Sequence, residues 1–153
     1  MTTPLSNLAN TASLLWHAYK SLPQPSSSVN WAGFYTLVPG PASASDQTLI
    51  LGPFMGKVAC QTIAVGRGVV GAAAQSRRTV LVPDVLAYPG HIACDAESRS
   101  EVVVPVTVGA GEAARLVAVI DVDCAEPDGF DEVDRLYLEK LAELLGKSCD
   151  WQL

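Results

Sequence analysis

The chain carries the stretch SEVVVPVTVGAGEAARLVAVIDVD from Ser100 to Asp123. Two strand-like apolar runs, at 102–108 and 116–120, flank a turn sequence that holds two glycines, and Asp121-Val122-Asp123 closes the second run. Runs of this kind, separated by a turn signal, predict two strands. If the two strands pair, they form the centre around which we expect the rest of the chain to be arranged.

The same stretch places three carboxylates at the ends of the two expected strands. Asp121 and Asp123 are separated by one residue, so their side chains point to the same face of a strand. Glu101 opens the first run. Pairing of the two strands would therefore bring the three carboxylates close together.

Cys94 lies in the polar sequence just before these strands, with His91, Asp95 and Glu97 as neighbours. Catalytic groups are often carried by loops on a rigid scaffold, although a surface loop with an incidental thiol has the same pattern. A cysteine beside a carboxylate cluster favours a small cationic or polar substrate and disfavours a phosphate. Cys94 is therefore a candidate nucleophile.

Composition indicates the class of protein. The 153 residues are 49% apolar and 17% charged, which predicts one folded domain over 1–153 with a sizeable core. The net charge of −6 argues against a nucleic-acid partner and against an anionic membrane surface. The apolar runs are too short for a membrane span and no secretory signal is visible, so we expect a cytoplasmic protein.

Periodicity predicts the other elements. Apolar residues spaced by three and four indicate helices near 5–22 and 130–144, and a short helix follows the glycine turn at 65–75. Further strands are expected at 30–38, 48–54, 58–63 and 79–82. This order predicts an α+β fold with a central, mostly antiparallel sheet.

The glycine turn has two interpretations. The N–H groups of Gly68, Val69 and Val70 would open a helix and could bind a substrate carboxylate. A tight helix entry packed on the sheet explains the same residues. The turn lacks the glycine spacing and the lysine of nucleotide-binding loops.

Several short motifs occur in a recognisable order between about residues 31 and 130. They are Asn30-Trp31-Ala32-Gly33-Phe34-Tyr35, Leu51-Gly52-Pro53-Phe54, Lys57-Val58-Ala59-Cys60, Gly66-Arg67-Gly68-Val69, Gly90-His91-Ile92-Ala93-Cys94-Asp95, Ser100-Glu101 and Asp121-Val122-Asp123. Together they resemble the free methionine-(R)-sulfoxide reductases, which are single GAF-type domains. The resemblance implies a GAF-like, six-stranded antiparallel sheet with N- and C-terminal helices packed on it, and a homodimer.

The resemblance also implies an activity, which is reduction of free L-methionine-(R)-sulfoxide with electrons from thioredoxin. By position, Cys94 matches the family's nucleophile and Cys60 a resolving cysteine. Trp31 and Tyr35 match aromatic positions of the pocket, and the three carboxylates match those around the substrate. Sulfoxide reduction by two thiols needs no metal and no organic cofactor.

Roles within the site follow from this chemistry. Clustered carboxylates raise one another's pKa, so Glu101 and Asp123 are candidates for the acid that protonates the sulfoxide oxygen. Asp121 is a candidate partner of the substrate ammonium group. Val70 stands where many members carry a third cysteine, which leaves Cys60 or Cys124 to resolve the sulfenic acid.

Two other classes remain open at this point. The chain could be a non-catalytic GAF sensory module that binds a small ligand, although no output segment accompanies the domain in this sequence. It could also bind a metal through Cys60, His91 and Cys94, but no C-x-x-C pair is present to support zinc.

Overall fold

The structure, a computed structural model, describes residues 3–38, 47–91 and 95–151. The three α-helices are α1 (Pro4–Ser21), α2 (Gly68–Ser76) and α3 (Glu132–Ser148). The strands are β1 (Val29–Leu37), β2 (Thr48–Gly56), β3 (Thr62–Ala64), β4 (Val80–Val82), β5 (Ser100–Val108) and β6 (Arg115–Cys124). None of the helices in the described ranges has the length and apolarity needed to cross a bilayer.

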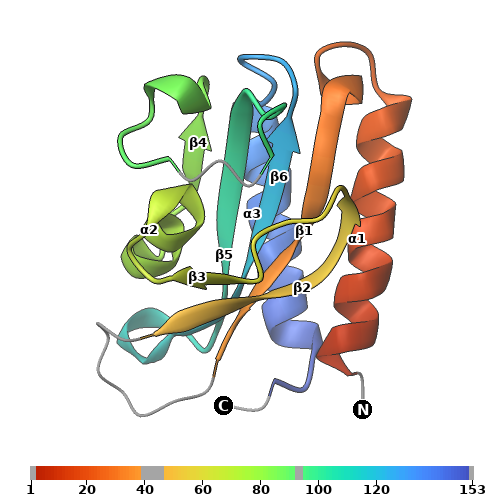
Figure 1. Cartoon of the computed structure of the whole chain (residues 1–153). Coiled ribbons are helices and arrows are strands. Elements are labelled where there is room, and N and C mark those ends of the chain that lie inside the picture. The colour runs from red at the N-terminus through yellow and green to blue at the C-terminus, as the bar shows by residue number, and fades with distance from the viewer. Residues whose placement is uncertain (1–2, 39–46, 92–94, 152–153) are drawn as a thin grey trace.

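The six strands form one sheet in the order β3-β2-β1-β6-β5-β4. Every neighbouring pair is antiparallel, which confirms the expected sheet. The two strands around which the chain was expected to fold, β5 and β6, lie side by side in it. Helices α1 and α3 cover one face of the sheet and α2 lies on the other (Figure 1).

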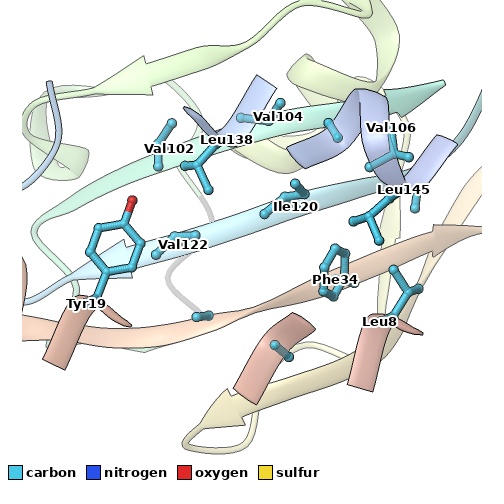
Figure 2. Packing of buried hydrophobic residues seen from close by; sticks show 14 of the residues in the cluster. Leu8, Tyr19, Phe34, Val102, Val104, Val106, Ile120, Val122, Leu138 and Leu145 are labelled. Atoms are coloured by element: carbon cyan, nitrogen blue, oxygen red, sulfur yellow. The ribbon is translucent and has the colours of Figure 1, made fainter. Parts of the chain in front are cut away.

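The face covered by α1 and α3 holds the larger apolar core. Phe34 of β1 and Ile120 of β6 lie at its centre, with Leu8 and Leu138 packed on them from the helices (Figure 2). Helix α3 approaches β5 closely because Gly146 faces the Thr107 carbonyl, where a Cβ atom would stand only 2.2 Å from the oxygen. This core fixes the strands and leaves the opposite face free for α2 and the loops.

The opposite face holds a second core. The side chains of Val103 and Val119 extend from the sheet, and Val69 and Ala73 of α2 cover them. Trp31 and Tyr35 of β1 belong to the same cluster. Side chains alternate between the two faces along a strand. Residues two positions away from Trp31, Val103 or Val119 therefore also point to the face covered by α2.

Two sequence expectations differ from the structure. The strand expected at 58–63 begins only at Thr62, and Val58 is 87% exposed, because the segment after β2 is a loop. In α3, the expected apolar stripe includes Tyr137 and Leu144, which are exposed. The buried stripe is displaced by one residue and includes Leu138 and Leu145. The helix face that contacts the sheet is the one that carries Gly146, which packs closely on β5.

Candidate active site

The sheet register gathers the three carboxylates on the α2 side. Asp123 of β6 lies between Trp31 of β1 and Glu101 of β5, in one row across the strands. Asp121, two residues back on β6, lies beside Gly33 in the next row. The three acids each present an oxygen within 4.8 Å of the others. The predicted proximity of the carboxylates, here called the triad, is confirmed.

A small cavity of about 40 Å³ lies against the triad. Trp31 and Tyr35 form an aromatic wall, and their ring centroids are 6.0 Å apart. The Trp31 ring also stacks on Phe54 at 5.2 Å. Gly33 makes this stack possible, because a Cβ atom there would lie 2.3 Å from that of Phe54. The remaining cavity-lining residues are Val58, Ala59, Ile63, His91, Asp95, Ser98, Glu101, Asp121 and Asp123.

The aromatic wall also anchors the loop that carries Cys60. The Trp31 indole donates to the Lys57 carbonyl at 3.2 Å, and the Tyr35 hydroxyl donates to the Cys60 carbonyl at 3.0 Å. Cys60 is half-buried. The residues that wall the cavity therefore also fix the backbone of this cysteine.

Burial raises the pKa values of the whole triad. The pKa of Glu101 lies well above its usual range because of burial, and the charges of Asp121 and Asp123 add to this effect. Burial raises the pKa of Asp121 to about 7. The pKa of Asp123 is also raised, although a hydrogen bond from Ser98 opposes the effect of burial. The triad therefore holds at least one proton near neutral pH, as predicted for a cluster of acids.

The triad is short of positive partners. His91 Nε2 lies 3.8 Å from Glu101 Oε2, but burial lowers the pKa of His91, so the ring is mainly neutral at pH 7. One oxygen of Asp121 is buried without a hydrogen-bond partner among the described residues. A buried acceptor of this kind costs stability unless a donor arrives. The site is therefore suited to a guest that brings a positive charge and hydrogen-bond donors.

Sequence reasoning missed the polar wall of the cavity, by which we mean Asp95 and Ser98 together with Asn30 that binds them. Asn30 donates from its side-chain amide to Asp95 and to Ser98, both at 3.1 Å. Lys57 and Glu97 form an ion pair at 2.7 Å, which joins the Cys60 loop to the segment that follows Cys94. Both Lys57 and Glu97 are exposed, so this pair contributes little to stability.

The comparisons with known proteins identify the family of the chain. The model of the GAF domain family matches residues 12–148. The free methionine-R-sulfoxide reductase of Saccharomyces cerevisiae is 54% identical over 143 residues, which cover 94% of this chain and 74% of the yeast protein. The chain belongs to the GAF-domain family of free methionine-R-sulfoxide reductases.

Two further relatives belong to the same family. The free methionine-R-sulfoxide reductase of Escherichia coli is 41% identical over 146 residues, covering 95% of this chain and 78% of that protein. The X-ray structure of the Neisseria meningitidis enzyme in complex with its substrate matches with a TM-score of 0.80 and 44% identity. That match covers 96% of this chain and 78% of the other. The resemblance inferred from the sequence motifs is confirmed.

In this member of the GAF-domain reductase family, the described residues leave the position of some predicted site residues at the cavity untested. Cys94 lies outside the described residues, and with it the alternative metal site that needs Cys94. Gly68 opens α2, while the side chains of Val69 and Val70 are buried in the second core. No side chain caps the N-terminus of α2. Carboxylate binding by this turn stays a prediction.

Proposed function

We propose that this protein reduces free L-methionine-(R)-sulfoxide to L-methionine. The observation that carries the proposal is a buried, proton-holding acid triad beside an aromatic wall, in a chain 54% identical to a yeast enzyme named for this activity. The triad can supply a proton to the sulfoxide oxygen and a negative charge to the ammonium group of the substrate. The aromatic wall offers an apolar surface to the methyl-sulfur end.

The substrate's ammonium group is assigned to Asp121, whose unpartnered buried oxygen requires a donor. Its methyl-sulfur end is assigned to Trp31 and Tyr35, and its carboxylate to the N–H groups that open α2.

Glu101 and Asp123 are the candidate acids. Both are buried and both have raised pKa values, so either retains a proton at a pH at which an exposed carboxyl would lose it. Transfer of this proton to the sulfoxide oxygen stabilises the charge that develops there as the S–O bond breaks.

The reducing step is assigned to Cys94. Its sulfur attacks the sulfoxide sulfur and forms an S–S bond. As the oxygen moves to the Cys94 sulfur, this S–S bond and the S–O bond of the substrate both break, methionine leaves, and Cys94 becomes a sulfenic acid. The Cys60 thiol then condenses with the sulfenic acid, forming a disulfide and releasing water. A dithiol protein of the thioredoxin type reduces this disulfide by exchange and becomes oxidised itself.

The placement of Cys124 favours Cys60 as the resolving thiol. Cys124 lies in the core under α1 and α3, on the face of the sheet opposite the triad. Burial raises the pKa of Cys124, which makes its thiolate scarce. The Cys60 backbone, in contrast, is fixed against the cavity wall by Tyr35. A cytoplasmic location fits this chemistry, because the resting thiols persist in a reducing compartment.

The expected homodimer has a candidate surface between α1 and α3. A groove of about 510 Å³ runs there, lined by ten uncharged residues that include Leu14 and Leu144. Both leucines are well exposed, at 70% and 59%. A second copy of the chain would bury this apolar surface on both partners at once, as a two-fold interface requires.

The first experiment follows both epimers of free methionine sulfoxide in the presence of a thioredoxin system. Loss of the free R epimer alone is expected. N-acetylated and amidated substrates should react several-fold more slowly or worse, since each leaves a buried polar group without its partner. Equal rates on free and acetylated substrate would contradict a site built for the free amino acid.

The second experiment assigns the thiols. Cys94→Ser is expected to form no methionine even in a single turnover. Cys60→Ser should release about one methionine per site and then stop with a sulfenic acid, because attack precedes resolution. Normal thioredoxin-dependent turnover in Cys60→Ser would show that another thiol resolves. Adding Val70→Cys to Cys60→Ser should restore turnover, because it returns a thiol to a position that the family often uses.

A further inference from the structure

Asn30 lies at an irregularity of β1. Val29 pairs with Cys124 of β6 and Trp31 pairs with Asp123, so two steps along β1 match one step along β6. Asn30 is the extra residue of this β-bulge. Bulges frequently occur next to active sites, where they redirect a side chain.

The bulge directs the Asn30 amide to the polar wall of the cavity. Its nitrogen donates to Asp95 Oδ2 and to Ser98 Oγ, each at 3.1 Å. Asp95 directly follows Cys94 in the sequence. A flipped amide would turn its oxygen toward the Asp95 carboxylate, so the charge of Asp95 fixes the orientation of the amide.

This orientation determines where the Ser98 proton goes. Ser98 is buried, and its hydroxyl accepts a hydrogen bond from Asn30. The single hydroxyl proton is therefore left for Asp123, which lines the same cavity as Ser98 and whose pKa is lowered by hydrogen bonding to it. A proton donated to a carboxylate favours the ionised form of that carboxylate. Asn30 thus acts on Asp123 through Ser98.

The other end of the amide argues against a purely structural role. Asn30 Oδ1 is buried and has no hydrogen-bond partner in the described part of the chain. A buried acceptor without a partner opposes folding. The stabilising contacts of this side chain are therefore offset in part, whereas its contacts to Asp95 and Ser98 both lead to the active site.

We propose that Asn30 is a positioning residue of the reaction, which ties the segment after Cys94 to β1 and turns the Ser98 hydroxyl toward Asp123. The proposal rests on the proposed function. The Ser98 hydrogen bond opposes the rise in the pKa of Asp123 that burial causes, which makes this candidate acid a stronger proton donor. The titratable groups around Asp123 are Glu101, Asp121, Asp95, His91 and Tyr35.

The test measures single-turnover methionine release against pH in Asn30→Ala, in Ser98→Ala and in the double variant. Each single variant should move the basic limb of the pH–rate profile upward by about one unit, because Asp123, a candidate acid, loses a hydrogen bond to its ionised form and its pKa rises. The double variant should show the same limb as Ser98→Ala alone, because both substitutions act through one hydroxyl. Ser98→Thr, which keeps the hydroxyl, should retain the wild-type limb.

Asn7→Ala is the matched control, because the Asn7 amide also donates one hydrogen bond, to Cys149 Sγ at 3.2 Å, but on α1 away from the cavity. Its pH profile should equal that of the wild type. A folded Asn30→Ala with an unshifted limb, or additive shifts in the double variant, would overturn the inference. Asn30→Ser replaces Asn30→Ala if the alanine variant does not fold.

The outcome also separates this inference from the proposed function. A wild-type protein that does not reduce free methionine sulfoxide contradicts the proposed function. An active wild type together with an unshifted Asn30 variant contradicts only the role of Asn30.

Discussion

Asp121 is a carboxyl group that the folded protein keeps largely protonated below neutral pH. Burial raises its pKa from the ordinary value of 3.8 to about 7, so ionisation costs more in the folded state than in the unfolded chain. The favourable contribution of the neutral acid is fully present below about pH 4 and is lost as the pH rises toward 7. Asp121 therefore opposes folding at neutral pH and above.

We expect Asp121→Asn to be more stable than the wild type and less active. The gain should be small at pH 4 and should grow to a few kcal/mol between pH 4 and pH 7, because the amide never ionises. Urea unfolding at several pH values measures it. Glu112→Gln, at an exposed turn, is the control and should show no such trend. A stability difference that does not change with pH would contradict the account.

The resting state of Cys94 gives a second prediction at this scale. Asp95 and Glu97 follow it in sequence, and His91 is mainly neutral because burial lowers its pKa. Negative neighbours disfavour a thiolate, so Cys94 should alkylate slowly in the free enzyme, with a rate that rises only above about pH 8. The substrate brings a positive charge, which lowers the cost of forming the Cys94 thiolate beside these negative neighbours. Rapid alkylation with a midpoint below neutral pH would show that a cation activates the thiol in advance.

The sequence was sufficient to assign some residues to the site but not others. Asp121 and Asp123 could be assigned to one face because strand side chains alternate, and Glu101 followed once β5 and β6 were paired. Asn30 could not be assigned in this way, because a bulge breaks the alternation at that position. Ser98 lies outside any strand, and only the folded loop shows that it reaches Asp123.

At the scale of elements, the missing side chain of Gly33 allows β1 and β2 to stack Trp31 on Phe54. Gly33→Ala should lower the free energy of unfolding by about 1–3 kcal/mol, because its Cβ atom would overlap Phe54. It should also raise KM by displacing the aromatic wall. Gly111→Ala is the control, since a Cβ atom there meets nothing within 4 Å and only the left-handed φ of 58° disfavours it. A KM in Gly33→Ala equal to that of the wild type would show that the stack of Trp31 on Phe54 does not contribute to substrate binding.

Element boundaries were predictable where the pattern was unambiguous. The α1 helix and strands β5 and β6 follow their apolar periods closely. The segment 58–61 has strand-like residues but lies in a loop, because Tyr35 binds the carbonyl group of Cys60 and Trp31 binds that of the preceding Lys57 before β3 begins. Tertiary hydrogen bonds of this kind leave no local signal in the sequence.

For the whole molecule, the uncharged groove between α1 and α3 predicts the surface through which two copies of the chain form a dimer. Leu14→Asp should turn a dimer into a monomer in light scattering, because it places a charge in an apolar interface. Leu86→Asp is the matched control, since Leu86 is equally exposed at 74% but lies outside the groove. An unchanged mass for Leu14→Asp, or a monomeric wild type, would exclude this surface.

The anchoring of the Cys60 loop has a consequence for how the family can vary. Trp31 and Tyr35 bind this loop through the main-chain carbonyls of Lys57 and Cys60, and not through its side chains. Every residue type carries such a carbonyl, so these anchors place no demand on the identity of the loop residues. Selection and protein engineering can therefore replace side chains in this loop, including the thiol, while its path past the cavity is preserved.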